Sequence, residues 1–490
     1  MVRSIKFAEI DIVPHKKVYG NEKNRNFAVM NKSGSPQSLG TDKISTLLKQ
    51  YAMPAIIAQV AASLYNIIDS IFVGQGVGPL AITGLALTMP MMNLTAAFGA
   101  MVGAGSAALT SIRLGQGNKP AAETILGNVV SLNVVMGIVL TFFGLFYLDE
   151  LLYFFGASEQ TLPYAREYMR IILYGNIITH LYHGLNCMLR VAGYPGKAMN
   201  ITIFAVALNA LLDWLFIFVF GWGIAGSAWA TVIAQLASVV VQIVHFSSPK
   251  SFLQFHRDAF RLHWDIIKNI ISVGMAPFMI QSCACVVVIL VNNTLRTHGG
   301  DLSIGAYGIA NRVAFLFTMV VMGLTQGMQP IAGYNYGARK FDRVRKVLWM
   351  TVWWGVATTT LGFVICELFP YQVVQIFVSE DGTGDATALI EASARGLRIL
   401  VLMLPIVGFN IVAGNFFQHI GKPKRAILLS VSRQMLFIVP LLFILPRWWG
   451  GDGVWYSIPI ADFTSSVLAA VLLAMQLRKL RENPSLEKSI

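Results

Sequence analysis

Two aspartates lie inside long apolar stretches of the sequence, where an ionised side chain is costly and usually has a function. Asp69 follows Tyr65 by one helical turn, and Asp213 follows Asn209 at the same spacing. Thr231 lies in the next apolar stretch after Asp213. Counting about 1.5 Å per helical residue from the ends of the stretches places Asp69, Asp213 and Thr231 at a similar depth. These side chains are therefore candidates for a single polar site.

The chemistry of this set is that of a cation site. Carboxylate, amide and hydroxyl oxygens are the ligands that small hard cations prefer. Two neighbouring carboxylates cannot both be ionised cheaply in a medium of low dielectric constant, so such a pair takes up H⁺ or a cation. We therefore predict that Asp69, Asn209, Asp213 and Thr231 bind Na⁺ or H⁺ and couple it to a function. The alternative is that each aspartate is only hydrogen-bonded to a neighbouring helix.

The composition is that of an integral membrane protein. Of 490 residues, 55% are hydrophobic and only 12% are charged, whereas a soluble domain has about 25% charged residues. The net charge of +13 does not indicate nucleic-acid binding, because the basic residues lie between the apolar runs and form no continuous face. The four cysteines lie inside apolar stretches and are interpreted as small hydrophobic residues.

The apolar runs predict twelve membrane-spanning helices, each at least as long as the ~20 residues that a bilayer requires. Several exceed this length, which implies tilted or curved helices. Their approximate limits are 44–72, 82–112, 123–147, 163–190, 196–220, 223–246, 266–295, 304–334, 345–369, 390–419, 424–446 and 453–477. Most lysines and arginines lie in the tails and the even-numbered loops, whereas the odd-numbered loops contain only Arg296 and Arg447. Because positive charge resists translocation, both termini are predicted to be cytoplasmic, in a bacterial plasma (inner) membrane.

The two ends of the chain are polar. Residues 1–43 are predicted to be a disordered, basic cytoplasmic tail, and residues 478–490 a second cytoplasmic tail. No apolar segment followed by a small-residue cleavage site precedes the first span, so no cleavable signal is expected. Met30 opens a second possible start, which leaves the true first residue open between Met1 and Met30.

An internal repeat divides the chain into two halves. Residues 81–86 match 305–310, 114–117 match 336–339, 190–198 match 418–426, and the segment from Gly226 matches that from Gly453. The order is kept, so we predict an N-lobe over 44–246, a cytoplasmic linker over 247–265 and a C-lobe over 266–477. The predicted fold is all-α, with two pseudo-symmetric six-helix bundles. Parallel repeats imply a two-fold axis along the membrane normal, with a cavity between lobes that rock to give alternating access.

The acidic pair of the N-lobe is not repeated in the C-lobe. The positions equivalent to Asn209 and Asp213 fall near Phe437 and Leu441, which are apolar. Ion coupling is therefore predicted to be confined to the N-lobe.

A few other ionisable residues also lie within apolar runs. Asp462, Arg312 and Arg433 are the candidates in the C-lobe, although the two arginines can equally belong to ion pairs within that lobe. His180 and His183 have the i, i+3 spacing of a possible metal site. Because no carboxylate is identified at their level, they are interpreted as core or cavity histidines.

At these positions the chain resembles the multidrug and toxic compound extrusion (MATE) family, over about residues 44–480. The resemblance rests on residues 65–69, on 114–117 and 190–195, on the Asn209–Asp213 spacing, and on Gly226 followed by Thr231. It implies two six-helix bundles that face a central cleft, with the cation site of the N-lobe at Asp69, Asn209, Asp213 and Thr231.

The resemblance also implies further site residues and a branch of the family. Tyr65 and Asn186 correspond to polar positions that line the cavity, and Arg312 and Asp462 are added here as cavity candidates from the C-lobe. The acidic residues that another branch uses in its C-lobe are not evident, which indicates the DinF-like and MepA-like branch.

The function expected from this resemblance is multidrug efflux, with no enzymatic activity. Lipophilic, mostly cationic drug-like compounds would leave the cell in exchange for Na⁺ or H⁺, with no cofactor besides the coupling ion. The expected partners are these small molecules and the lipid bilayer, with no nucleic acid and with the protein acting as a monomer. The alternative is a flippase of the same superfamily that moves lipid-linked precursors or polysaccharides.

Overall fold

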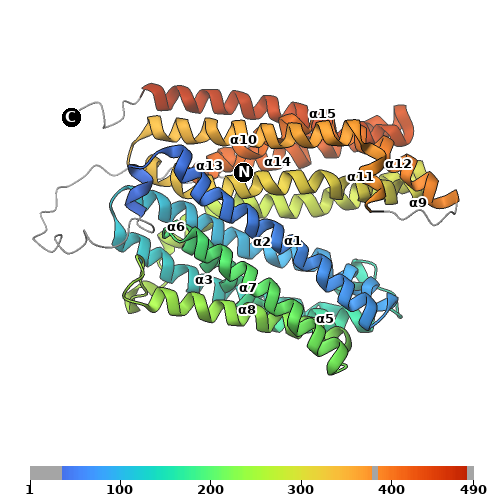
Figure 1. Cartoon of the computed structure of the whole chain (residues 1–490), viewed down its shortest axis with the longest axis horizontal. Coiled ribbons are helices and arrows are strands. Elements are labelled where there is room, and N and C mark those ends of the chain that lie inside the picture. Colours follow the sequence, from blue (N-terminus) through green and yellow to red (C-terminus); the bar gives the residue numbers. More distant parts are fainter. Residues whose placement is uncertain (1–35, 378–383, 483–490) are drawn as a thin grey trace, which may run out of the picture.

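The computed structural model of this chain describes residues 36–377 and 384–482. The described residues form helices and no strands, and the long helices run roughly along the longest axis of the molecule (Figure 1). The helices coloured blue to green form one bundle and those coloured yellow to red form the other, so the two predicted lobes lie side by side. The predictions for residues 1–35, including Met30, and for residues 483–490 lie outside the described residues.

The helices of the N-lobe and the linker follow the predicted order. Their bounds are α1 (Ile44–Gly76), α2 (Pro79–Gly115), α3 (Lys119–Phe146), α4 (Leu148–Phe154), α5 (Leu162–Tyr174), α6 (Asn176–Val191), α7 (Pro195–Trp214), the π-helical segment η2 (Leu215–Val219), α8 (Gly223–Ser247) and the 3₁₀ helix η3 (Arg257–Phe260). Asn118 caps α3, where its side chain accepts a hydrogen bond from the backbone N–H of Ala121 at 3.1 Å.

The C-lobe repeats this order, but some of its spans follow one another within a single longer element. Its elements are α9 (Trp264–Gly337), α10 (Phe341–Leu368), α11 (Pro370–Gln375), α12 (Gly384–Val401), α13 (Leu404–His419), α14 (Pro423–Val431), the π-helical segment η4 (Ser432–Ile438) and α15 (Val439–Glu482). Gly300 interrupts α9 at φ 68° and Gly450 interrupts α15 at φ 56°. Because positive φ ends regular helical geometry, α9 contains two spans, and α15 contains the end of one span and the whole of the next.

Nine helices of the described residues are long and apolar enough to cross a membrane, or ten if the pair Ala386–Val401 and Leu404–His419, bent by 52°, is one span. The segment Pro423–Glu482 counts as one of the nine but contains two predicted spans. The span predicted at 163–190 is formed by α5 and α6, which meet at Gly175. The twelve-span fold is therefore confirmed, and the correction is that the spans at 163–190 and 390–419 are each two helices and not one.

The backbone repeats its unusual conformations at equivalent positions of the two lobes. The pairs with positive φ are Gly117 (73°) with Arg339 (58°), Gly193 (97°) with Gly421 (67°), and Gly223 (59°) with Gly450 (56°). Arg339 is the only non-glycine with positive φ among the described residues, and it lies where the repeat has Gly117 in the N-lobe. The internal repeat read from the sequence is thus a repeat of backbone geometry.

The two lobes meet closely through a reciprocal pair of glycines. A Cβ atom on Gly115 of α2 would lie 1.9 Å from the carbonyl oxygen of Tyr334 of α9. A Cβ atom on Gly337 of α9 would lie 2.1 Å from the carbonyl oxygen of Ile112 of α2. Because each contact is the repeat equivalent of the other, they are related by the pseudo-two-fold axis, and only glycine allows this approach.

The segment before the first span is partly folded. Pro36–Gly40 forms the 3₁₀ helix η1, and Leu39 is buried with 1% exposure. The carbonyl oxygen of Leu39 accepts hydrogen bonds from Asn335 at 2.9 Å and from Arg343 at 3.0 Å, both in the C-lobe. The prediction of a disordered tail over 1–43 is therefore wrong for residues 36–43, because a buried leucine and paired carbonyl groups fix this segment against the other lobe.

The predicted inter-lobe linker is attached to α3 by one buried amide. The side chain of Asn128 donates hydrogen bonds to the carbonyl oxygens of Ala259 at 3.0 Å and Arg261 at 3.1 Å, and accepts one from the N–H of His263 at 3.1 Å. Ser131 makes a further bond to this segment, to the carbonyl oxygen of Phe260 at 2.8 Å in an exposed position.

Replacing Asn128 with Ala is expected to lower the free energy of unfolding of the protein by about 1–3 kcal/mol, because three backbone groups of the linker lose a partner in a buried position. Thermal unfolding of the purified protein in detergent measures the effect. Ser131→Ala is the matched control, and it should have little effect because water replaces its exposed hydrogen bond. Equal unfolding midpoints for the two variants would contradict this role of Asn128.

Candidate functional site

The predicted cation-site residues lie together inside the N-lobe. Asp69 comes from α1, Asn209 and Asp213 come from one face of α7, and Thr231 comes from α8. Each of the four is at most 4% exposed. Helices α7 and α8, which follow one another in the sequence, and α1, which is distant from them in the sequence, therefore contribute to one buried polar cluster.

Hydrogen bonds connect these helices through the cluster. The hydroxyl oxygens of Tyr65 on α1 and Thr231 on α8 are 2.6 Å apart. The amide of Asn209 donates from Nδ2 to Oδ2 of Asp213 at 3.1 Å, and its oxygen accepts from the backbone N–H of Thr231 at 3.3 Å. The side chain predicted to line a cavity, Tyr65, is thus a member of the cluster itself.

Ser227 and Tyr168, which were not among the predicted site residues, also belong to this cluster. The hydroxyl of Ser227 on α8 donates a hydrogen bond to Oδ1 of Asp69, and Ser227 is fully buried. Tyr168 on α5 is 1% exposed and lies close to Asp69 and Asp213. Ser227 precedes Thr231 by one helical turn, so spacing alone could have indicated it. Tyr168 gives no such signal, because its position depends on how α5 packs against the other helices.

The cluster has capacity for a cation. Oδ1 of Asp213 is buried and has no hydrogen-bond partner among the described residues. A buried carboxylate oxygen without a partner is unfavourable, and a second carboxylate, that of Asp69, lies close enough to repel it. A proton or a small cation bound among the carboxylate, amide and hydroxyl oxygens removes both costs.

A π-helical segment follows the cluster directly. Segment η2 (Leu215–Val219) begins two residues after Asp213, and a second π-helical segment, η4 (Ser432–Ile438) in the C-lobe, contains Arg433. Such segments are rare and occur often at functional sites, because the extra residue per turn rotates the side chains that precede it. Each lobe thus has a π-helical segment beside an ionisable side chain, although the two segments do not occupy equivalent positions of the repeat.

Asn186 lies outside this cluster. Its amide nitrogen donates to the carbonyl oxygen of Ala198 at 3.1 Å and to the hydroxyl of Thr202 at 3.3 Å, while its oxygen accepts from Arg190 at 2.8 Å. These hydrogen bonds connect α6 with α7 inside the N-lobe, and the cavity-lining role of Asn186 stays a prediction.

The two histidines of α6 do not converge on a metal site. His180 is buried, and its Nε2 lies 3.0 Å from the carbonyl oxygen of Thr95 on α2, whereas His183 is exposed. No group of three or more potential metal-binding side chains occurs in the part of the chain that the structure describes. The four cysteines are free, and Cys283 and Cys366 are buried as small apolar residues.

In the C-lobe, Asp462 and Arg433 form an ion pair. Nε of Arg433 lies 2.6 Å from Oδ1 of Asp462, which connects η4 with α15. Both residues line a cavity of about 370 Å³ inside the C-lobe, together with apolar side chains of α9, α12, α13 and α15. Of the two interpretations of Arg433, the lobe-internal ion pair is correct. Asp462 borders this cavity, whereas its predicted contact with a substrate stays a prediction.

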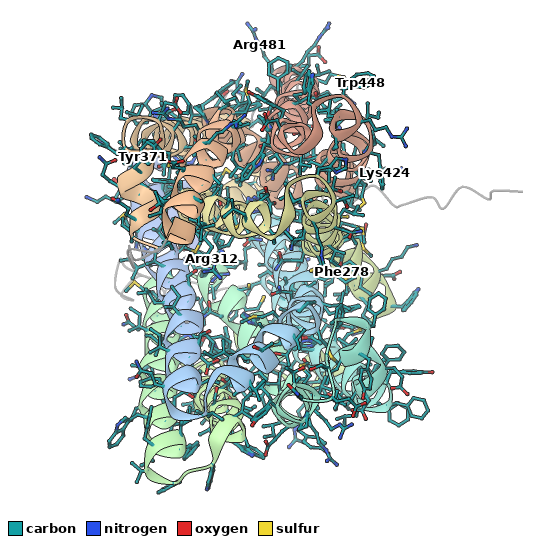
Figure 2. The ribbon with its side chains drawn as sticks, turned by 90° about the vertical axis from the view of Figure 1, so that its right-hand side faces the viewer. Phe278, Arg312, Tyr371, Lys424, Trp448 and Arg481 are labelled. Carbon is teal, nitrogen blue, oxygen red and sulfur yellow. The ribbon has the colours of Figure 1, made fainter. Side chains whose placement is uncertain are left out.

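Arg312 of α9 behaves differently from Arg433. Its side chain is exposed and has no hydrogen-bond or ion-pair partner among the described residues. Viewed along the long axis of the molecule, Arg312 and Phe278 both lie where the C-lobe faces the N-lobe (Figure 2). The ring of Phe278 contacts that of Phe98 on α2, with centroids 4.7 Å apart, so the two lobes touch there as well.

The chain is similar in sequence to proteins described as multidrug export proteins. The multidrug export protein MepA of Staphylococcus aureus (strain MRSA252) is 23% identical over 431 residues, which cover 88% of this chain and 93% of MepA. MepA of Staphylococcus saprophyticus is 23% identical over 433 residues with the same coverage.

Solved structures agree with the observed fold. One is described as the outward-facing conformation of a multidrug resistance MATE family transporter of the MOP superfamily; it has a TM-score of 0.86 and 23% identity, and the match covers 92% of this chain and 100% of that one. A MOP superfamily transporter from Pyrococcus furiosus, described as having a binding pocket of reverse polarity, has the same TM-score, identity and coverage.

A family model covers most of both lobes. The MatE model matches residues 54–215 and 277–444, which include Asp69, Asn209 and Asp213 of the N-lobe cluster and Arg433 of the C-lobe. Together with the twelve-span fold and the repeated lobes, this match shows that the chain belongs to the MatE family.

Proposed function

We propose that this membrane protein is a multidrug exporter that exchanges lipophilic, mostly cationic organic compounds for Na⁺ or H⁺. The observation that carries the proposal is the buried cluster of Asp69 and Asp213, because ionisable groups inside membrane spans mark ion pathways. The relatives named as multidrug export proteins support the export of several drug-like compounds. Because one chain supplies both lobes, the protein is proposed to act as a monomer.

The proposed orientation has both termini in the cytoplasm of a bacterial cell. The glycine contacts between the lobes, at Gly115 and Gly337, lie at the end of the molecule that carries η1. The basic tails and even-numbered loops belong to the same end, which supports a cytoplasmic location. In this orientation the described conformation is closed toward the cytoplasm, and it corresponds to the state that releases substrate outward.

Coupling follows from the position of the cluster between three helices. A cation or proton that neutralises the carboxylates of Asp69 and Asp213 strengthens the contacts among α1, α7 and α8, whereas the ionised pair weakens them by repulsion. Ion and substrate are coupled if they favour opposite arrangements of these helices. External Na⁺ or H⁺ would thus favour the arrangement that expels the compound, and release of the ion inside would restore the empty, inward-open state.

The identity of the coupling ion can be tested with the purified protein in lipid vesicles. Ethidium transport is expected under one of the two gradients, imposed separately: Na⁺ or pH. It should stop when an ionophore dissipates the gradient that drives it. Vesicles without protein are the control. Absence of ethidium movement under both gradients, with protein correctly inserted, would contradict ion-coupled export.

A further inference from the structure

The cavity inside the C-lobe differs in charge from the acidic cluster of the N-lobe. Its ionisable side chains are Arg433 and Asp462, which neutralise one another on balance. The two are not equally accessible, however. The side chain of Arg433 is 31% exposed, whereas that of Asp462 is 5% exposed. A molecule in the cavity therefore meets the guanidinium group first, with the carboxylate behind it.

The guanidinium group retains most of its hydrogen-bonding capacity. Its Nε donates to Asp462 at 2.6 Å, and it makes no other hydrogen bond to the described residues. An arginine has five N–H donors, and the two terminal nitrogens match the two oxygens of a carboxylate. Because the exposed part of the ion pair is a donor group and carries positive charge, it attracts an anionic acceptor and repels an ammonium group.

The rest of the cavity wall suits an amphipathic molecule. Gln281, Asn311 and Gln434 line it and have no hydrogen-bond partner among the described residues, so their amides are available to a ligand. The remaining wall is mostly apolar, with Phe315 and Met322 among its members. A volume of about 370 Å³ lies within the range of drug-sized binding sites. Arg433 itself lies in the π-helical segment η4.

We propose that this C-lobe cavity is a substrate subsite that selects amphipathic compounds carrying a carboxylate, by hydrogen bonds from Arg433. The proposal rests on the export function and defines a substrate class for it, namely zwitterionic or acidic amphiphiles in addition to cations. A single arginine, paired with Asp462 through its Nε and with its terminal nitrogens unused by the described residues, matches a group with one negative charge, whereas a diphosphate would need more than one cation. Arg312 lies outside this wall.

The test uses two dyes that differ in one group. Rhodamine B carries a free carboxylate on a lipophilic cationic ring system, and its ethyl ester carries the same ring system without that charge. Binding of each dye to the purified full-length protein in detergent is measured by fluorescence anisotropy. The wild-type protein is expected to bind rhodamine B about tenfold or more tightly than the ester, as a charge-assisted hydrogen bond implies.

Variants then assign this preference to Arg433. In Arg433→Gln/Asp462→Asn both charges are removed together, which leaves no unpaired buried charge and so protects the fold. This double variant is expected to bind both dyes with affinities within about twofold of each other, while its affinity for the ester stays near that of the wild type. Arg312→Gln, which removes an arginine outside the cavity, should keep the wild-type preference.

Two results would overturn the proposal: equal affinity of the wild-type protein for the two dyes, or an unchanged preference in the double variant. Binding in detergent needs no ion gradient, so it is independent of the transport assay in vesicles. A protein that exports ethidium without preferring rhodamine B retains the proposed function and loses this subsite. A protein that prefers rhodamine B but shows no ion-coupled transport retains this subsite and loses the proposed export function.

Discussion

Replacing Asp213 with Asn is expected to reduce ion-coupled drug export to the level of membranes without the protein, while the protein remains folded. The replacement has nearly the same shape, and its side-chain oxygen can still accept the hydrogen bond from Asn209 that Asp213 accepts at 3.1 Å. What it removes is the charge that attracts the ion. Because a buried carboxylate with an unpartnered oxygen is itself unfavourable, the free energy of unfolding should stay constant or rise.

The measurement is ethidium efflux from cells and transport into vesicles, combined with thermal unfolding of the purified variant. Asp69→Asn should give the same loss, because the hydroxyl of Ser227 can still bond to the amide oxygen that replaces a carboxylate oxygen. Asp149→Asn is the matched control: that aspartate is 45% exposed and pairs with Arg166 at 2.6 Å away from the cluster. Its transport should be close to that of the wild type, since exposed ion pairs contribute little. Export by the Asp213→Asn protein at the parental rate would contradict the coupling of ion binding at this site to drug export.

Replacing Gly337 with Ala is expected to push the lobes apart where they now touch. The added Cβ would lie 2.1 Å from the carbonyl oxygen of Ile112, far closer than any normal contact, and a backbone oxygen cannot turn away as a side chain can. Forcing such a contact costs about 1–3 kcal/mol. A penalty of this size changes the ratio of two conformations by roughly 5- to 150-fold, so the population of the arrangement described here should fall by that factor relative to the separated one.

Spin labels on α2 and α9 near this end of the molecule report the distance between the lobes. We expect a larger separation in Gly337→Ala, together with a strong loss of export, because the cycle needs both states. Gly115→Ala should reproduce the effect through the reciprocal contact with Tyr334 at 1.9 Å. Gly308→Ala on the same helix α9 is the control, since a Cβ atom there meets nothing within 4 Å. Unchanged distances in both Gly337→Ala and Gly115→Ala would show that the backbone accommodates the methyl group without separating the lobes.

Because Gly115 and Gly337 lie in matched segments of the repeat, the sequence identifies them as equivalent positions. It does not show that they form a contact between the lobes. Residues 114–117 and 336–339 match in the sequence, and Gly117 and Arg339 share positive φ in the structure. A sequence match records that the same local conformation is used twice. That Gly115 and Gly337 each face the other lobe is a consequence of how the two bundles pack, which one bundle alone does not contain.

The sequence by itself determined the membrane fold and the identity of the acidic residues. Apolar runs have no stable place outside a bilayer or a large core, and a charge within such a run is conspicuous in any arrangement. Asp69, Asn209 and Asp213 were therefore evident from type and spacing alone. The breaks at Gly175 and between α12 and α13 were not evident, because a bend within an apolar run leaves the mean hydropathy unchanged.

Only the tertiary structure decided which polar side chains meet. Ser227 and Tyr168 joined the cluster, Asn186 was directed to α7, and Arg433 was paired with Asp462 while Arg312 was left exposed. The physical reason is that hydropathy sets how deep a helix lies but not its rotation about its own axis or its tilt, which follow from packing against neighbouring helices. The π-helical segments η2 and η4 each add an extra residue per turn, which the apolar pattern of the sequence does not reveal.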